Sequence, residues 1–428
     1  MNQNYFTACF VLVVMASIAC SAQSKKLLVR NPAIYKRQDE LIVLKRIALP
    51  RQFKTLTKDL FLRITDGTGR VQTVQFDDLD KDGIWDEAVF LYTLKPLEQA
   101  AFSVGITTER LNSGMIRAHV RQRRKNADNT FAASVDTDSI PAGQPNTDFS
   151  KEKLPPFLTE GPAWENDKVG FRLYLDVRNG KDIWGKTTTA MMMDTVGVDP
   201  TVIYHNRAPW GMDIYKVGSS LSAGALALIL KLKNGSDTLI RLGGKNMGKV
   251  IYEKVADGPV RAIFRIKYPE WNIAPGFKPV SLTEEISIWG GQFFYQSSVT
   301  IGNAPAAAKL VTGFANLYQV TAHELESQKS KILYAYGLQS ENIDNLGLAI
   351  LGNRSEILSF GKSLETEKDI RDSYLVTFKP LSNSLPVIFR FYAAWQPTDT
   401  EFANPEQYKN FLRNQSVLYD KKVNLSWK

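Results

Sequence analysis

The chain has 428 residues, 44% of them hydrophobic and 23% charged, a composition that excludes a disordered chain and allows one large domain or two ordinary ones. Its net charge of +9 fits an anionic polysaccharide partner or an unspecific basic surface, and no nucleic-acid motif accompanies it. The only cysteines are Cys9 and Cys20, so the chain beyond them has no disulfide, thiolate nucleophile or Cys-based zinc site.

The N-terminus, residues 1–22, has the layout of a secretory signal peptide. An apolar run at 5–19 is too short for a comfortable membrane span, and small residues follow it. Cleavage after Ala22 would release a soluble periplasmic or secreted protein, whereas cleavage before Cys20 would leave a lipoprotein with a lipid anchor. We favour the soluble product because Ser17 stands where a lipobox usually has Leu. No second membrane span is predicted.

Residues 23–110 contain the first predicted strands, an N-terminal β subregion. The runs KKLLVRN, DELIVLKRIAL, LFLRITD, RVQTVQF and EAVFLYTL are short, apolar or alternating, and bounded by turn residues. Residues 111–160 are polar and carry Pro and Gly, which predicts a connecting segment. Strand-like runs return over 161–428, and one clear helix is predicted at 405–420. We therefore expect an all-β protein, a large antiparallel β-sandwich with few short helices, continuous with the N-terminal subregion.

An acidic turn, DDLDKDGIWDE, spans residues 77–87 between two predicted strands. Carboxylates at alternate positions around a Gly resemble a calcium loop, but the twelfth position is Val89 where a bidentate Glu is usual. The alternative is an Asp/Gly-rich hairpin turn, and we expect no cofactor and no bound metal. The weak candidates for calcium ligands are Asp78, Asp80, Asp82 and Asp86.

Polar and aromatic residues concentrate in WENDKVGFRLY at 164–174 and in KDIWGK at 181–186. If residues 170–174 form a strand, Arg172 and Tyr174 share one face, because side chains alternate along a strand. An Arg beside aromatic rings suits a sugar that carries a carboxylate, although a salt-bridged loop with Trp164 in the core is the alternative. The candidate binding residues of these segments are Trp164, Glu165, Asn166, Asp167 and Lys186.

A third such segment, YHNRAPWGMDIYKVG, begins at Tyr204. It contains His205, and an imidazole is the usual proton-transfer group near neutral pH. A loop punctuated by Pro and Gly on a β scaffold is a common place for functional residues, although a lone histidine is often structural. The other candidates here are Arg207, Trp210, Asp213 and Tyr215, and we expect the residues of the three segments to line one cleft.

Several motifs are absent from the sequence. It contains no GxGxxG or GxxxxGK[ST] phosphate loop, no HExxH and no GxSxG. These absences argue against a nucleotide-binding protein, a zinc hydrolase of that type and a serine hydrolase.

The three polar segments, followed by SLSAGALAL, resemble the secreted proteins of domain-of-unknown-function family 4861 (DUF4861), as does DDLDKDGIWDE before AVFL. The resemblance covers most of the mature chain, but LPPFLTEGPA precedes Trp164 where an Arg/Lys/Asp-rich lead-in is expected. It implies a galactose-mutarotase-like β-supersandwich, an association with polysaccharide-utilisation gene clusters, and β-elimination on uronate-containing oligosaccharides.

Such an elimination, by a lyase or an oligosaccharide dehydratase, needs a neutralised carboxylate, a base and an acid. The residues proposed for these roles are Arg172 with Lys186 or Arg207 at the carboxylate, His205 at the C5 proton, and Tyr215 or Tyr174 at the leaving oxygen. A glycoside hydrolase would instead pair Glu165 or Asp167 with Asp213. A carbohydrate-binding protein without catalysis would use the same aromatic residues and no base.

Overall fold

The computed structural model describes residues 24–54, 56–110, 114–365, 369–382 and 385–428. The predicted signal peptide at 1–22, with Cys20, lies outside the described residues. Within the described part, no helix is long and apolar enough to cross a membrane.

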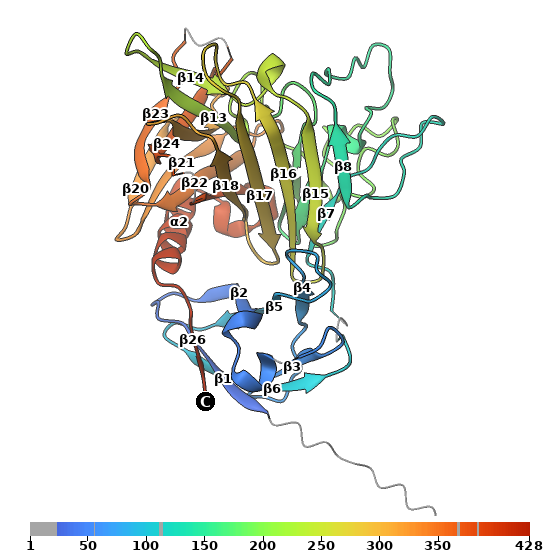
Figure 1. Ribbon diagram of the computed structural model, residues 1–428, viewed down its shortest axis with the longest axis vertical. Coiled ribbons are helices and arrows are strands. Elements are labelled where there is room, and N and C mark those ends of the chain that lie inside the picture. Colours follow the sequence, from blue (N-terminus) through green and yellow to red (C-terminus); the bar gives the residue numbers. More distant parts are fainter. Residues whose placement is uncertain (1–23, 55, 111–113, 366–368, 383–384) are drawn as a thin grey trace, which may run out of the picture.

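The N-terminal unit consists of two small sheets, at the bottom of Figure 1. A four-stranded sheet has the order β26-β1-β6-β3 and a three-stranded sheet has the order β2-β5-β4. The strands are β1 (Lys25–Arg30), β2 (Arg37–Lys45), β3 (Phe61–Asp66), β4 (Gln75–Asp77), β5 (Glu87–Leu94), β6 (Gln99–Thr107) and β26 (Asn424–Trp427). The short helices η1 (Arg46–Ala48) and α1 (Arg51–Lys54) follow β2. The inward-facing side chains of both sheets, such as Ile42, Phe90 and Phe102, form the core of this unit.

The main unit is built around a nine-stranded antiparallel sheet. Its order is β20 (Ala322–Glu326), β21 (Ser330–Leu338), β22 (Asn345–Asn353), β25 (Val387–Trp395), β18 (Phe294–Gly302), β17 (Val280–Trp289), β16 (Arg261–Trp271), β15 (Val250–Ala256) and β8 (Thr137–Ile140). One five-stranded sheet has the order β12 (Gly211–Asp213), β11 (Lys181–Lys186), β10 (Val169–Leu173), β9 (Ala163–Asn166) and β7 (Ala118–Arg121). The other has the order β14 (Asp237–Arg241), β13 (Ala223–Lys231), β19 (Lys309–Ala315), β24 (Ser373–Pro380) and β23 (Ile357–Lys362).

The main hydrophobic core lies between the nine-stranded sheet and the two five-stranded sheets. In β17, alternate residues are buried, among them Leu282, Glu284, Ile286 and Ile288, while the residues between these are only partly buried, which is the period-2 pattern of a strand with one face in the core. Phe171 and Trp164 of the facing sheet pack among them. The predicted large antiparallel β-sandwich with few helices is confirmed.

Helix α2 (Pro405–Asp420) covers the opposite face of the nine-stranded sheet (Figure 1). It begins as the sequence predicts, with Pro405 in the first turn and the side chain of Asn404 accepting a hydrogen bond from the backbone N–H of Gln407. A Cβ at Gly347 would lie 2.5 Å from the Tyr408 ring, so β22 needs a glycine where the helix approaches it.

Four further short 3₁₀ helices of the described chain are η2 (Leu158–Glu160), η3 (Gly244–Asn246), η4 (Gln396–Thr398) and η5 (Thr400–Phe402).

The division of the chain differs from the expected one at two places. The C-terminal strand β26 pairs with β1 and so belongs to the N-terminal unit, not to the main sandwich. Residues 111–160, expected to be a connecting segment only, contribute β7 and β8 to the main sheets. The basic run at 117–125 reads as the end of a strand and matches β7, whereas alternation over a run as short as TDSI is too weak a pattern to predict β8.

Candidate functional site

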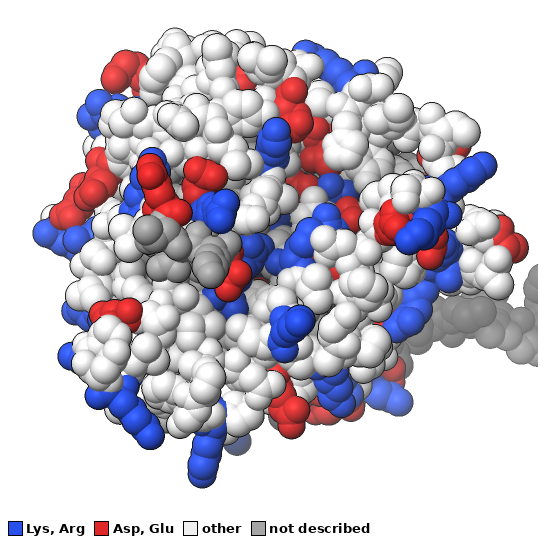
Figure 2. Space-filling model, turned by 90° about the horizontal axis from the view of Figure 1, so that it is seen from above, with Lys and Arg blue, Asp and Glu red and all other residues white. Residues whose placement is uncertain are grey.

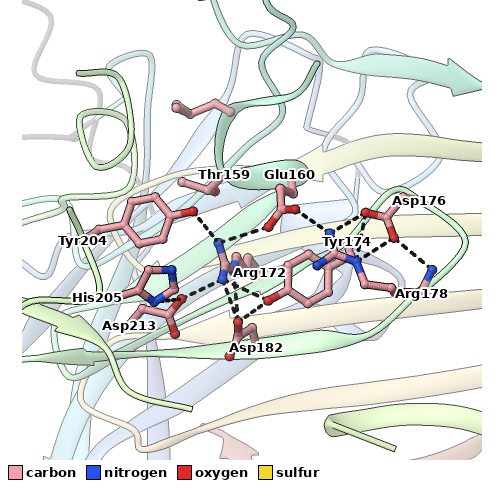
Figure 3. Close-up of polar contacts among 12 residues, drawn as sticks. Thr159, Glu160, Arg172, Tyr174, Asp176, Arg178, Asp182, Tyr204, His205 and Asp213 are labelled. Carbon is pink, nitrogen blue, oxygen red and sulfur yellow. Dashed lines mark hydrogen bonds and ion pairs between the residues drawn. The ribbon is translucent and has the colours of Figure 1, made fainter. Parts of the chain in front are cut away.

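A cluster of charged and aromatic side chains lies on the outer face of the sheet that contains β10, β11 and β12 (Figure 3). Because side chains alternate along a strand, Phe171 points into the core and Arg172 points outward. Arg172 is the cross-strand partner of Asp182 in β11, and Asp213 comes from the next strand, β12. The register of three neighbouring strands therefore brings one guanidinium and two carboxylates together.

Arg172 is fully occupied by groups of the protein itself. Its Nη2 donates to Asp182 Oδ2 at 2.7 Å and to Asp213 Oδ2 at 2.6 Å, and its Nε donates to Asp182 Oδ2 at 3.2 Å. Both carboxylates and the Arg172 side chain are 2% exposed. Glu160 Oε2 lies 3.7 Å from Nη1 on a further side. The guanidinium is thus a buried counter-ion for several carboxylates.

Aromatic rings enclose the same guanidinium. Its carbon Cζ lies 4.7 Å from the ring centroid of Trp184, 4.8 Å from that of Tyr174 and 5.4 Å from that of Tyr204. The Tyr174 hydroxyl accepts from Arg172 Nη2 and donates to Asp182 Oδ2, and the Tyr204 hydroxyl accepts from Nη1 at 3.3 Å. Cation–π contacts and these hydrogen bonds fix the position of the guanidinium.

His205 lies at the open edge of the cluster, in contact with Tyr204 (Figure 3). Its Nδ1 is 3.4 Å from Asp213 Oδ2, and its side chain is 56% exposed while that of Asp213 is 2% exposed. The imidazole is therefore held from behind by a buried acid that Arg172 also binds. This arrangement leaves the other ring nitrogen, Nε2, for a ligand.

Burial shifts the proton affinities of these groups. Burial, and then the charge of Arg172, lowers the pKa of His205 below its ordinary value of 6.5, so the imidazole is neutral at pH 7. Burial, and then the neighbouring Asp182, raises the pKa of Asp213 well above the usual range of a carboxyl group. Burial also raises the pKa of Tyr204, whose hydroxyl keeps its proton at neutral pH. The open edge thus offers a neutral base beside a protonated phenol.

Two consecutive residues at the edge of the cluster have left-handed backbone conformations, Thr159 with φ 48° and Glu160 with φ 69°. Such conformations cost non-glycine residues about 1–3 kcal/mol each and persist only when their surroundings impose them. Arg121 imposes them here, because its Nη1 donates to the carbonyls of Leu158 at 2.8 Å and Gly161 at 2.7 Å. The backbone turn thereby directs the Glu160 carboxylate toward Arg172.

Glu160 also connects the cluster to the end of the molecule that carries β13 and β14. Its Oε1 accepts from Arg178, which in turn is bound by Asp176 (Figure 3). The turn with Arg178 contacts the end of β14, where Arg241 Nη2 donates to the Arg178 carbonyl at 2.8 Å. Viewed from this end, the surface is hollowed near its centre, and Lys and Arg side chains gather there beside a group of Asp and Glu side chains (Figure 2).

Residues 187–210 form a loop that covers part of the outer face. Met193 and Val196 pack on Trp184, and Trp210 and Tyr204 pack against the same group. The predicted binding residue Trp210 is half-buried in this contact. The loop therefore leaves the surface around His205 as the exposed part of the cluster.

Two further charged groups belong to this region, Arg207 from the same loop and Glu341 from a distant part of the chain. The exposed Arg207 places its Cζ 5.4 Å from the ring centroid of Trp395 in β25 and makes no ion pair within the described residues. Glu341 follows β21, acts electrostatically on His205, and accepts a hydrogen bond from the Tyr318 hydroxyl at 3.1 Å. A cation from the same loop and a carboxylate from a distant segment thus belong to the surroundings of the imidazole.

Several predicted site residues lie elsewhere, so the expectation of one common cleft does not hold for them. Trp164 is fully buried and packs on Phe171, Phe264 and Tyr295 in the main core. Both faces of β9 are covered, and an indole there is a core residue instead of a stacking surface for sugar.

The acidic residues of the first segment are also structural. Glu165 and Lys186 form an ion pair in which both side chains are 0% exposed, and Glu165 Oε1 accepts from the backbone N–H groups of Met192 and Met193. The Asn166 amide donates to the carbonyls of Trp289 and Gln292. These residues bind backbone and one another, and none is free for a ligand.

Asp167 and Tyr215 likewise have partners away from the cluster. Asp167 accepts from Arg117 Nε at 2.7 Å and from the Gly291 N–H at 2.6 Å. The buried Tyr215 hydroxyl accepts from the Ala315 N–H at 2.7 Å. Tyr215 therefore cannot be the exposed acid, and no hydrolase pair of Glu165 or Asp167 with Asp213 forms on this surface.

Arg172 and Tyr174 do share one face, as predicted, but both are buried. The role of ligand clamp expected for Arg172 conflicts with its contacts, because its donors already face carboxylates. Tyr174 is 4% exposed and bound to Asp182. Of the predicted residues, the structure brings His205, Asp213, Arg172 and Tyr174 together, with Arg207 two positions from His205.

Three groups of this site are not among the residues that the sequence predicted for it. Asp182 stands opposite Arg172, and only the strand register places it there. Tyr204 is adjacent to His205 in the sequence, so its neighbourhood was visible but not its contact with Arg172. Glu160 lies in the LPPFLTEGPA stretch, where nothing in the local sequence marks it.

The acidic turn at 77–87 lies apart from this cluster, in the N-terminal unit. Asp78, Asp80 and Asp86 each offer one oxygen within 4.8 Å of the others. Carboxylate oxygens of all four candidates, including Asp82, already accept backbone N–H groups of the same turn. The absence of a bound metal stays a prediction.

Three of the solved structures that resemble this chain are only weakly similar to it. An alpha-mannosidase from Enterococcus faecalis V583 is 12% identical with a TM-score of 0.48, covering 95% of this chain and 46% of that one. A glycosyl hydrolase family 38 protein from Enterococcus faecalis is 11% identical with a TM-score of 0.47, covering 95% and 47%. A putative aldose 1-epimerase from Klebsiella pneumoniae subsp. pneumoniae MGH 78578 is 11% identical with a TM-score of 0.32, covering 71% and 97%. This chain spans less than half the length of the first two, and no activity is carried over because every TM-score is below 0.5.

Sequence comparison is more informative. A protein of Formosa agariphila described as "Uncharacterized protein P7" is 25% identical over 370 residues, which are 79% of this chain and 81% of that protein. The family model described as "Domain of unknown function (DUF4861)" matches residues 29–425, nearly all of the described chain. The chain belongs to the DUF4861 family.

Proposed function

We propose that this protein is a carbohydrate-active enzyme that acts on uronate-containing oligosaccharides by β-elimination, with His205 as the base. The observation that carries the proposal is the pair formed by the half-exposed His205 and the buried Asp213. A general base must be neutral at the working pH and reach its substrate, and His205 meets both requirements. The family resemblance and the net charge of +9 support an acidic sugar as the substrate.

In the proposed reaction, His205 Nε2 takes the proton from C5 of the uronate. The electrons of that C–H bond form the C4–C5 double bond, and the C4–O bond breaks with its electron pair going to the leaving oxygen. An acid must protonate that oxygen, and we assign this role to Tyr204, which takes the place expected for Tyr215. Its ring centroid is 4.7 Å from that of His205, and its raised pKa keeps the hydroxyl protonated.

The substrate carboxylate must be neutralised, because the C5 proton is otherwise too weakly acidic. Arg207 suits this role, since its guanidinium is exposed, has no carboxylate partner among the described residues, and follows His205 by two positions. Arg172 then acts indirectly, because it fixes the Asp213 carboxyl behind the imidazole. We class Arg172 as a positioning residue.

The predicted signal peptide supports export, with a soluble periplasmic or secreted product and a lipid anchor at Cys20 as the alternative. An exported enzyme of this kind would meet polysaccharide fragments outside the cytoplasm. The proposed localisation is tested by N-terminal sequencing of the mature protein, which should begin at Gln23. A mature start at an acylated Cys20 would contradict the soluble form.

The direct test of the activity is incubation of purified protein with a panel of uronate oligosaccharides. Elimination produces an alkene conjugated to the acid, which absorbs at about 235 nm. Loss of one water from an intact oligosaccharide identifies a dehydratase, whereas two shorter products, one of them unsaturated, identify a lyase. New reducing ends without absorbance would show hydrolysis, and binding without products would show a non-catalytic protein; either result refutes the proposal.

A further inference from the structure

A cavity lies between the N-terminal unit and the main unit, where β2 faces α2 in Figure 1. Its volume is about 1200 Å³, enough for several sugar rings. The N-terminal wall is β2, and the opposite wall consists of β18, β25 and one side of α2. No lining residue belongs to the cluster around His205, so the cavity is a separate place on the molecule.

The two walls are held together by a buried arginine. Arg37 is 2% exposed, and its Nη2 donates to the carbonyl of Leu418 at 3.0 Å and to that of Lys421 near the end of α2. Its other donors bind Asn31 at 2.9 Å and Glu40 at 2.9 Å within the N-terminal unit. The cavity is therefore a built feature with fixed walls, not a loose gap between two bodies.

Arg390 in β25 is the central charged group of the cavity wall. Its Cζ lies 4.4 Å from the ring centroid of Phe294, 5.5 Å from that of Trp289 and 5.4 Å from that of Tyr419. Its hydrogen-bond neighbours are neutral, Gln296 with Oε1 at 3.4 Å from Nε, and Tyr392. No carboxylate of the described residues pairs with this guanidinium, unlike Arg172, whose donors face acids.

The remaining charges of the cavity leave a positive excess. Glu40, Glu87 and Asp399 are each within ion-pair distance of a basic residue. Lys36 and Lys422, like Arg390, have no such partner in the described part of the chain. Glu356 and Glu401 are the only lining carboxylates among the described residues without an ion-pair partner, two acids against three unpaired basic groups. An anionic ligand is therefore favoured over a cationic one.

The neutral polar groups of the wall are of the kind that bind sugar hydroxyls. Asn414 and Gln415 of α2 and Gln296 of β18 line the cavity, and amides both donate and accept hydrogen bonds. Trp289 and Tyr419 provide aromatic surface beside them. Amides, aromatic rings and a free guanidinium together match a sugar chain that carries acid groups.

We propose that this interface cavity is a second binding site, which holds an acidic oligosaccharide with its carboxylate or sulfate on Arg390. The guanidinium binds the acid group through two N–H donors, and the amides of α2 bind the hydroxyls of the same or the next ring. The ligand class follows from the cavity itself and does not depend on the elimination proposed for His205. The site would hold a long chain at the boundary of the two units while another part of the molecule is processed.

The test is isothermal titration calorimetry on the full chain carrying His205→Ala, which binds without turnover. The probes are tetragalacturonate for carboxylates, a sulfated carrageenan tetrasaccharide for sulfates, and neutral maltotetraose. At least one acidic probe should bind, and Arg390→Gln should weaken binding at one site by about 10- to 100-fold, as loss of charge-assisted hydrogen bonds does. Arg413→Gln, on the exposed side of α2, is the matched control and should change affinity less than about twofold.

A second variant distinguishes a loss of binding from a loss of folding. Asn414→Leu keeps the aromatic wall and Arg390. It should weaken the binding of the acidic probe and leave the melting temperature of the protein unchanged. The proposal is overturned if neither acidic probe binds, if maltotetraose binds equally well, or if Arg390→Gln and Asn414→Leu bind like Arg413→Gln. Binding here with no unsaturated product from the wild-type chain would refute the proposed elimination alone, and product formation with unaltered binding in these variants would refute the cavity site alone.

Discussion

Replacing Arg172 by Met should destabilise the protein strongly, because it removes the counter-ion of a buried acidic cluster. The change leaves Asp182 and Asp213, both 2% exposed, without their guanidinium, and Glu160 loses a charge 3.7 Å away. Removing one partner of a buried ion pair costs about 3–5 kcal/mol. Since the pKa of Asp213 is already raised, its carboxyl takes up a proton readily. We therefore expect a loss of stability at the lower end of this range, about 3 kcal/mol.

The assay is thermal unfolding of Arg172→Met beside the exposed control Arg413→Met. At about 2–4 °C per kcal/mol, the melting temperature should fall by roughly 10 °C, against a change of about 1 °C for the control. The loss should be larger at pH 8 than at pH 5. The charge of Arg172 lowers the pKa of Asp213, so its removal raises that pKa further above the unfolded value, and the folded variant binds an extra proton and gains stability as the pH falls.

An unchanged melting temperature would refute the structural role of Arg172. It would restore the sequence-based interpretation of Arg172 as a ligand clamp, since a clamp is dispensable for folding. An equal loss at both pH values would refute the reasoning about the carboxyls specifically.

Three further predictions concern the site, the core and the acidic turn. Since the pKa of His205 is lowered, kcat/KM of the proposed reaction should decline as the solution is made more acidic, with the midpoint of the decline below pH 6.5. It should stay level toward pH 9, because the pKa of Tyr204 is raised. A midpoint above pH 7 would contradict this. Gly185→Ala should lower stability by about 1–3 kcal/mol in denaturant unfolding, because a Cβ there would lie 2.5 Å from the Trp395 ring, and an unchanged midpoint would show that β11 can shift. Calcium should leave the melting temperature unchanged, and a rise that Asp80→Ala abolishes would show a metal site in the turn.

The strands of this fold were predictable because most have one face in the core and one toward solvent. In β17, alternating burial matches alternating hydrophobicity, and Pro, Gly and Asp mark the turns. The short strands of the central sheet behave differently, since every residue of β9, β10 and β11 is buried. There a polar side chain does not indicate solvent, and a tryptophan such as Trp164 does not indicate an exposed surface.

The site was predictable only where its residues are close in sequence. His205 stood out as a histidine in an irregular loop, and Arg172 and Tyr174 share a face through simple alternation. The pairing of Arg172 with Asp182, by contrast, depends on the register of a hairpin. Glu341 comes from a distant segment, and no local pattern connects it with His205. Polar residues that form hydrogen bonds and ion pairs with one another inside the protein were therefore interpreted as ligand-binding residues.

The central claim is that the exposed imidazole of His205 transfers a proton, and the most direct measurement compares initial rates at about 235 nm for the wild type, His205→Ala and the neighbouring exposed control Asn206→Ala. Turnover of His205→Ala should fall by about two to four orders of magnitude, the usual contribution of a positioned base, and Asn206→Ala should keep the wild-type rate. Both variants should melt like the wild type, because the His205 side chain is 56% exposed. A His205→Ala protein that keeps wild-type turnover, or loses it only by unfolding, would contradict the account.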